Sequence, residues 1–200
     1  MDAPRSEAQP ALDWVIRPMT EADIPRLAEI RPGFVSATVL DVQRIGEGIE
    51  AGWRLVERAL DHPFDKGAGY DFDRTEQRNI LNRLRRGDGL HLVAEQGGRL
   101  IGVLDVVPEE WNSTAWVWNL MLDHDARGRG LGREFFERAA SWARRQGYRA
   151  LIFETQSNNV PACKFYAAMG CTLEGIRTAY YTNEDLERRE VALFWAYRLG

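Results

Sequence analysis

The chain has 200 residues, 44% of them hydrophobic and 28% charged, which is typical of one domain with a sizeable buried core. Its formal net charge of −4 lacks the basic excess of a nucleic-acid-binding protein, so we expect no nucleic-acid partner. No apolar run approaches the roughly 18 residues of a membrane span, so we expect no membrane partner either.

Residues 1–12 contain two prolines and no apolar stretch, so they predict a flexible tail rather than a signal peptide. We expect residues 13–200 to form a single domain. Residues 14–19 have the pattern of a short first strand. Thr20, with Asp23 three positions later, then forms an imperfect capping box that opens a helix.

The segment from 34 to 88 has the weakest pattern in the chain. Apolar residues at positions 45, 49, 53, 56 and 60 suggest one helix, ended by Pro63. A second helix begins near Asp73, and the glycines at 87 and 89 mark a turn after it. We interpret this segment as a helical insertion before the second strand of the sheet.

From residue 90 onward, strands and helices follow one another with clear boundaries, which predicts an α/β domain. The expected elements are a strand pair at 90–95 and 100–107, a strand at 116–123, a helix at 131–147, a strand at 150–155, a helix at 158–169 and two closing strands at 172–181 and 190–198.

The two cysteines, Cys163 and Cys171, fall in segments that we expect to be ordered and apolar. They are too few for a disulfide framework and lack the spacing of a zinc site, so we expect no metal. Buried free thiols fit a reducing compartment, and we expect a cytoplasmic protein.

The most informative local feature is the glycine-rich run Arg127-Gly128-Arg129-Gly130-Leu131-Gly132, placed between a strand and an amphipathic helix. A helix N-terminus presents unpaired N–H groups and a partial positive charge, and glycines let the backbone approach a pyrophosphate closely. The run lacks the spacing of a dinucleotide fold and the Lys-Ser/Thr ending of a P-loop. It predicts a phosphate site, and an ordinary glycine-rich connection is the alternative.

The Arg-x-x-Gly-x-Gly spacing of this run resembles the pyrophosphate loop of the GNAT superfamily of acetyltransferases. A second segment, Asn159, Ala162 and Tyr166 followed by Gly170, is similar to the superfamily's Asn-x-x-Ala-x-x-x-Tyr-x-x-x-Gly segment. The resemblance implies a GNAT fold, with a mixed, mostly antiparallel central sheet flanked by helices. It also implies an N-acetyltransferase that uses acetyl-CoA.

The resemblance implies how the cosubstrate is held. The glycine loop would bind the pyrophosphate, with charge added by Arg127 and Arg129. A splayed strand would offer its backbone to the pantetheine arm at Leu120, Met121 and Leu122, although these are core strand residues on the plainer interpretation. Asn159 would contact the same arm, and its alternative role is a helix N-cap.

The resemblance makes Tyr166 the candidate general acid, with its hydroxyl facing the sulfur of CoA; a core aromatic is the alternative. Glu154 is the candidate base or amine anchor, because it ends a buried strand beside the cleft and burial raises the pKa of a carboxyl. A structural carboxylate paired with an arginine is its alternative.

A narrower likeness covers roughly residues 90–200. The run Glu154 to Cys163, the Trp111-Asn112 pair and Phe194-Trp195 look like the corresponding parts of streptothricin acetyltransferases. Where those enzymes have a glutamate on the strand before the glycine loop, this chain has Trp118, followed by Asn119.

We expect three residues to line the acceptor pocket: Trp118, Asn119 and Tyr181. Trp118 is either a core residue or a cation–π partner for an alkylammonium group. The leading hypothesis is direct transfer of an acetyl group to a primary amine of a small molecule, such as a streptothricin-like antibiotic or another amine metabolite. A protein or peptide N-acetyltransferase and a CoA-binding module without catalysis are the alternatives. A homodimer is a further expectation, since many relatives dimerise.

Overall fold

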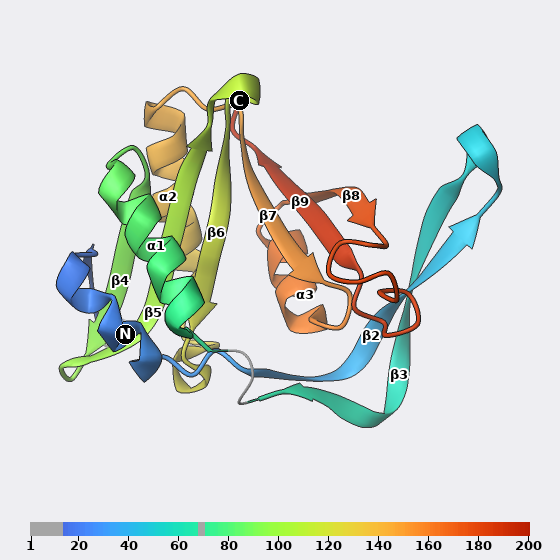
Figure 1. Ribbon diagram of the computed structural model, residues 1–200, viewed down its shortest axis with the longest axis horizontal. Helices are drawn as coiled ribbons and strands as arrows, with labels where there is room; N and C mark the ends of the chain where they lie inside the picture. Colours follow the sequence, from blue (N-terminus) through green and yellow to red (C-terminus); the bar gives the residue numbers. More distant parts are fainter. Residues whose placement is uncertain (1–13, 68–70) are drawn as a thin grey trace, which may run out of the picture.

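The computed structural model describes residues 14–67 and 71–200, so the tail predicted for residues 1–12 lies outside the described residues. A seven-stranded sheet in the order β1-β4-β5-β6-β7-β9-β8 forms its centre (Figure 1). The strands are β1 (Val15–Pro18), β4 (Leu90–Gln96), β5 (Arg99–Glu109), β6 (Thr114–Leu122), β7 (Ala150–Gln156), β9 (Ala192–Arg198) and β8 (Thr172–Arg177). In this sheet β6 and β7 run parallel and the other neighbours are antiparallel. The expected mixed, mostly antiparallel sheet is confirmed.

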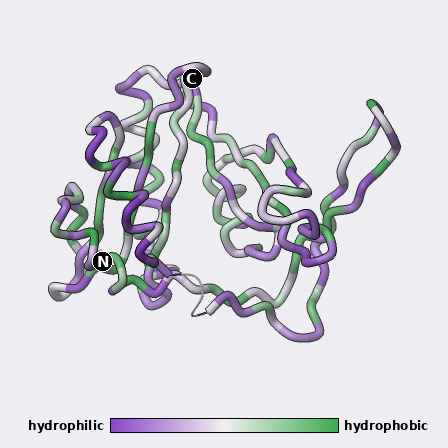
Figure 2. The backbone as a smooth tube through the Cα atoms, in the orientation of Figure 1, coloured by the Kyte–Doolittle hydropathy of each residue, from purple (hydrophilic) through white to green (hydrophobic). Residues whose placement is uncertain are grey.

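Helices cover both faces of the sheet. Helix α1 (Arg74–Arg86) lies on one face, and α2 (Leu131–Arg145) and α3 (Val160–Ala168) lie on the other. Because side chains alternate along a strand, Leu92 and Ala94 of β4 pack in the α2 core, while Val93 packs with Ile80 of α1. The tube in Figure 2 shows this mixture of apolar and polar positions along the strands.

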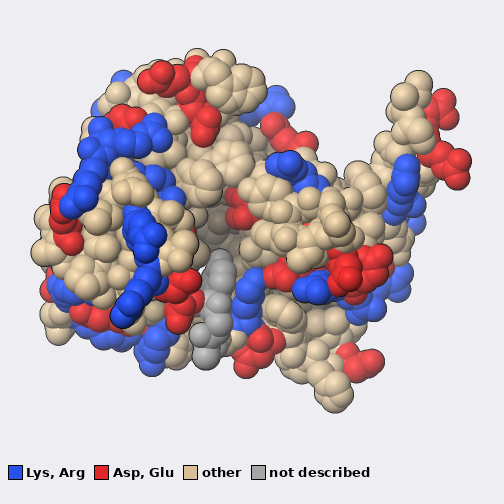
Figure 3. All heavy atoms as spheres, in the orientation of Figure 1, with Lys and Arg blue, Asp and Glu red and all other residues tan. Residues whose placement is uncertain are grey.

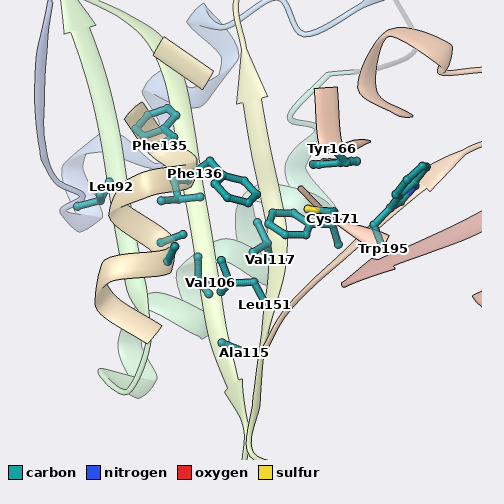
Figure 4. Packing of buried hydrophobic residues seen from close by; sticks show 14 of the residues in the cluster. Leu92, Val106, Ala115, Val117, Phe135, Phe136, Leu151, Tyr166, Cys171 and Trp195 are labelled. Carbon is teal, nitrogen blue, oxygen red and sulfur yellow. The ribbon is translucent and has the colours of Figure 1, made fainter. Parts of the chain in front are cut away.

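The main core is built on aromatic contacts between α2 and β7. Phe135 and Phe136 of α2 are buried, and the ring of Phe136 stacks on Phe153 with centroids 5.4 Å apart (Figure 4). Cys163 and Cys171 are buried free thiols, as expected. Among the described residues, no helix combines the length and the apolar character that crossing a membrane requires.

The interpretation of residues 34–88 as a helical insertion is wrong for its first part. Residues 34–66 form a long antiparallel hairpin of β2 (Phe34–Ile45) and β3 (Gly52–Lys66), which extends away from the domain in Figure 1. The apolar positions from 45 to 60 matched a helical spacing, but the segment contains four valines and two isoleucines, which favour strands. The second helix was predicted correctly: α1 has Asp73 as its N-cap and ends at Gly87.

The hairpin is attached to the domain near the end of β7. The backbone N–H of Leu40 donates a hydrogen bond of 2.9 Å to the carbonyl of Ser157. Glu57 forms an ion pair of 2.7 Å with Lys164 of α3. At the far end of the hairpin, Ile49 is fully exposed.

The feature that positions the site is the separation of β6 from β7. The two strands pair along Thr114–Val117 and Ala150–Phe153 and then diverge, while β6 continues against β5 as far as Leu122. Trp118 is the extra residue of a β-bulge at the point of divergence, where it faces the register shift between Asp105 and Val106. The splayed strand expected at residues 120–122 is confirmed.

Candidate active site

A cavity of about 860 Å³ opens where β6 and β7 diverge. Figure 3 shows the hollow on one face of the molecule, with an acidic side chain inside it. The predicted site residues that line the cavity are Trp118, Asn119, Leu120, Met121, Leu122, Arg127, Gly128, Gly130, Gly132, Glu154, Asn159 and Tyr166. Three others, Arg129, Leu131 and Tyr181, do not line it. The structure therefore brings most of the predicted residues to one place.

The glycine loop has the geometry of an open anion cradle. Gly128 and Gly130 have φ values of 72° and 98°, which glycine adopts without strain. Gly130 is the N-cap of α2. Because glycine has no side chain, the N-cap residue offers no acceptor to the first N–H groups of this helix. A Cβ placed at either glycine would meet open space. This combination suits a phosphate group.

The arginines of the loop have different surroundings from those expected. The Arg127 guanidinium lines the cavity and donates to the backbone carbonyls of Pro32 and Leu122. Arg129 lies over the ring of Trp14, 5.2 Å from its centroid. Arg133, from the first turn of α2, lines the cavity instead and is a residue that the sequence did not single out.

The free edge of β6 forms a second wall of the cavity. Leu120, Met121 and Leu122 pair with β5 along one edge of the strand. Along the other edge, no strand of the described chain pairs with them, because β7 has already diverged. Their outward backbone groups are therefore available to an extended ligand such as a pantetheine arm.

Glu154 lies on the opposite wall, near the end of β7. The hydroxyl of Tyr181 donates a hydrogen bond to its Oε1 atom, so Tyr181 reaches the site through Glu154. Removal of water raises the pKa of the Glu154 carboxyl, against smaller lowering effects of Tyr181 and Lys66. The pKa of Tyr181 is also raised, by its own burial and by the carboxylate beside it. A half-buried carboxylate with a raised pKa can accept a proton from an amine.

Tyr166 and Asn159 enter the cavity from α3. The ring of Tyr166 is buried and lies 4.8 Å from the ring of Phe153, centroid to centroid. Tyr166 therefore packs with the buried hydrophobic residues (Figure 4) and also lines the cavity. The side chain of Asn159 caps α3 by accepting a hydrogen bond of 3.2 Å from the N–H of Ala162. Asn159 therefore fills the capping role, and it also lines the cavity.

Trp118 and Asn119 belong to a network that joins β6 to α1. Asn119 is buried, and its Nδ2 donates to Glu76 at 3.0 Å and to Asp105 at 3.2 Å. Arg83 forms ion pairs with both of these carboxylates. Its guanidinium also lies 5.1 Å from the ring centroid of Trp118, so the chain itself supplies a cation there.

The sequence did not identify the contribution of the α1 segment. Asp71, Asp73 and Glu76 line the cavity with Glu154, so four carboxyl groups contribute to its wall. Asp73 and Glu76 were recognised only as the opening of a helix, because nothing local indicates that α1 packs beside β6. Gln156, two residues after Glu154, also lines the cavity and was also missed.

The comparisons with known proteins agree with this geometry. Residues 53–171 match the family model described as the acetyltransferase (GNAT) family. The streptothricin acetyltransferase of Escherichia coli is 29% identical over 84% of this chain and 86% of its own length. That of Streptomyces lavendulae is 26% identical over 87% of this chain and 89% of its own.

Solved structures give the same picture. The crystal structure of nourseothricin acetyltransferase has a TM-score of 0.78 at 27% identity, and the match covers 94% of this chain and 100% of that one. A Bacillus anthracis protein solved in complex with acetyl coenzyme A has a TM-score of 0.74 at 21% identity, a likeness of fold, over 92% of this chain and 99% of that one. The chain belongs to the acetyltransferase (GNAT) family and is an N-acetyltransferase.

Proposed function

We propose that the protein transfers the acetyl group of acetyl-CoA to a primary amine of a small molecule, with a streptothricin-like antibiotic as the leading acceptor. One observation carries the proposal: Glu154, whose pKa is raised, and Tyr166 line the same cavity as the open N-terminus of α2. Acetyl-CoA is the acetyl donor of this family, and it supplies the acetyl group as a thioester. The glycine loop and the free edge of β6 fit its pyrophosphate and its extended arm.

The residues of the chain divide the chemistry among them. Glu154 accepts a proton from the ammonium form of the acceptor, directly or through water, and leaves a nucleophilic amine. An N–H near Leu120 or Met121 stabilises the negative charge that develops on the carbonyl oxygen, a contribution of about 3 kcal/mol in other enzymes. Tyr166 then donates a proton to the departing sulfur, and the second proton that the nitrogen loses after attack passes through water to replace it on Tyr166. The new bond is an amide, and the bond that breaks joins the carbonyl carbon to sulfur.

The charge of the acceptor side supports a cationic acceptor. Four carboxyl groups, from Asp71, Asp73, Glu76 and Glu154, line the cavity together with two arginines, Arg127 and Arg133. Because both arginines belong to the glycine loop and the first turn of α2, they suit the phosphate end. Although Glu76 is also paired with Arg83 and Asp73 caps α1, the four carboxylates together favour a cationic amine substrate.

A protein N-terminal amine is the second candidate acceptor. The [ribosomal protein bS18]-alanine N-acetyltransferase of Salmonella typhimurium is 26% identical over 66% of this chain and 80% of its own length. The two candidates share the donor and the chemistry. They differ in whether the acceptor is a small molecule or a peptide terminus.

The experiment is a thiol-release assay with saturating acetyl-CoA and a panel of acceptors. Streptothricin, simple diamines and peptides with free N-termini form the panel. We expect streptothricin or another small amine to release CoA fastest. Release with peptides alone would support the second candidate, and release with no amine would contradict both.

A CoA-binding module without catalysis makes a separate prediction. It would be stabilised by acetyl-CoA, by about 2.7 kcal/mol at a hundredfold excess over Kd, without turnover of any amine. Thermal unfolding with acetyl-CoA, CoA and NAD therefore accompanies the assay. We expect a higher Tm with acetyl-CoA and no change with NAD.

We also propose that the protein forms a homodimer. Ile45 and Ile49 are exposed near the tip of the β2–β3 hairpin, and such side chains are candidates for burial against a second copy. Sedimentation of the wild-type protein and an Ile45→Ser, Ile49→Ser variant tests this expectation. Equal masses at the value of one chain would contradict it.

A further inference from the structure

Gln156 is a buried polar residue in the cavity wall with an unused acceptor. Its side chain is attached near the end of β7, and the residue is 8% exposed. Its Oε1 atom has no hydrogen-bond partner among the described residues. A buried acceptor without a partner destabilises the folded protein, so each such atom requires an explanation.

The neighbouring hydrogen bonds determine which end of the amide is unused. The Tyr181 hydroxyl has one hydrogen, and it is donated to Glu154. Gln156 also forms a side-chain hydrogen bond with Tyr181. Because the hydroxyl proton is donated to Glu154 and Oε1 of Gln156 has no partner, the amide nitrogen is the donor in this bond. The amide nitrogen is therefore committed to Tyr181. The carbonyl oxygen is the end that remains.

The position of this oxygen relates it to the proposed base. Glu154 and Gln156 are two residues apart on β7, so their side chains lie on the same face of the strand. Both line the cavity. A carboxylate and an amide oxygen on one face together match a group that carries several N–H donors. A primary ammonium has three, and a tertiary amine has none in its neutral form.

We propose that Oε1 of Gln156 accepts a hydrogen bond from the acceptor amine, and that Gln156 thereby orients and selects primary amines for attack. This inference rests on the proposed function, because it names a specificity-determining residue of the same cavity. Glu154 takes the first of the two protons that the ammonium loses, and Gln156 holds the N–H that remains on the nitrogen in the amide product. The Gln156–Tyr181–Glu154 chain fixes the distance between these two roles.

Two substitutions separate the acceptor role of Gln156 from its donor role. Gln156→Met keeps the size of the side chain and removes both functions, whereas Gln156→Glu keeps an acceptor and loses the donation to Tyr181. We expect Gln156→Met to raise the KM for streptothricin about 10- to 100-fold, as loss of a hydrogen bond to a charged group predicts. We expect Gln156→Glu, assayed at alkaline pH, to stay within about threefold of wild type, since a carboxylate also accepts.

The controls test whether each variant folds and whether its use of acetyl-CoA, the acetyl donor, is unchanged. Gln43→Met makes the same chemical change on the β2–β3 hairpin, where Gln43 bonds Asp41, and should leave both KM values unchanged. The KM for acetyl-CoA should stay the same in all three variants. Thermal unfolding with acetyl-CoA checks that each variant is folded. If Gln156→Met does not fold, the comparison of Gln156→Glu with wild type still decides.

An N-methylated acceptor gives an independent readout. Methylation removes one N–H, so it should reduce kcat/KM in wild type more than in Gln156→Met, because that variant no longer uses the hydrogen bond. A purely steric effect would be the same in both proteins. The inference is overturned if Gln156→Met keeps the wild-type KM for streptothricin, or if Gln156→Glu loses as much as Gln156→Met. If the wild type acetylates no amine in the panel, the proposed function fails, which is a different result.

Discussion

The hydroxyl of Tyr181 donates a hydrogen bond to the carboxylate of Glu154, and so joins the loop after β8 to the cavity wall on β7. Tyr181 is positioned by its own loop, where its N–H donates to Asp185 at 3.0 Å. This hydrogen bond orients the carboxylate of Glu154, which lines the cavity. Glu154, the proposed base, and the tyrosine that supports it are 27 positions apart in the chain.

The first prediction concerns Glu154 itself. Glu154→Gln should lower kcat/KM about 100- to 10,000-fold, because the amide cannot take a proton from the amine. Since the pKa of Glu154 is raised and its ionised form is the active one, the wild-type rate should increase as pH rises through that raised pKa. The variant should lack this limb of the pH profile. Glu50→Gln, at the hairpin tip, is the matched control, and equal rates for both variants would contradict the assignment.

The second prediction concerns Tyr166. Tyr166→Phe should lower kcat about 10- to 1000-fold, because a thiolate is an undemanding leaving group and water can replace a lost general acid in part. The ring is kept, so its contact with Phe153 and the Tm should be preserved. The Kd of acetyl-CoA, measured by calorimetry, should not change. Tyr148→Phe serves as the control, and an unaltered kcat in Tyr166→Phe would remove Tyr166 from the mechanism.

The third prediction concerns the glycine loop. Gly130→Ala forces alanine to a φ of 98° and should cost about 1–2 kcal/mol of unfolding free energy. Gly97→Ala, at a φ of 57° in the β4–β5 turn, should cost a similar amount. Only Gly130→Ala should also raise the KM for acetyl-CoA, because its methyl group would occupy the space before the helix N-terminus. Equal KM values in the two variants would contradict the phosphate cradle.

The fourth prediction concerns stability rather than activity. Asp23 is buried and accepts two hydrogen bonds of 2.8 Å from Arg17, which lower the pKa of its carboxyl from 3.8 to about 2. A depressed folded-state pKa means that the stabilisation is complete above the unfolded value and is lost as pH falls toward the folded value. Asp23→Asn should therefore cost about 2 kcal/mol in urea unfolding at neutral pH. The difference from wild type should shrink between about pH 4 and pH 2, whereas the exposed Asp88→Asn should show little effect at either pH.

Local patterns were sufficient for the part of the fold from residue 90 onward. The turn at Gly97 and the helix starting after Gly130 are each determined by nearby residues, and each lies where it was expected. Asn159 caps α3, which was the alternative role for this residue. The β2–β3 hairpin was missed because its pairing partner lies up to 32 positions away, from Phe34 to Lys66, and an accidental helical spacing was the stronger local pattern.

The same distinction applies to the candidate site. Glu154 and Tyr166 follow from motifs that are continuous in the chain, and the structure places both in one cavity. Glu76 reaches Asn119 only because α1 packs beside β6, and no local pattern contains that information. Arg129 is the opposite case. It belongs to the glycine-loop motif, but tertiary packing places its guanidinium over the ring of Trp14.

The most direct test of the account is a mass-spectrometric analysis of streptothricin after incubation with acetyl-CoA and either the wild-type protein or Glu154→Gln. We expect a product with one added acetyl group on an amine, formed rapidly by the wild type and at least about 100-fold more slowly by the variant. Unmodified streptothricin, together with no acetylated amine across the rest of the panel at saturating acetyl-CoA, would contradict it.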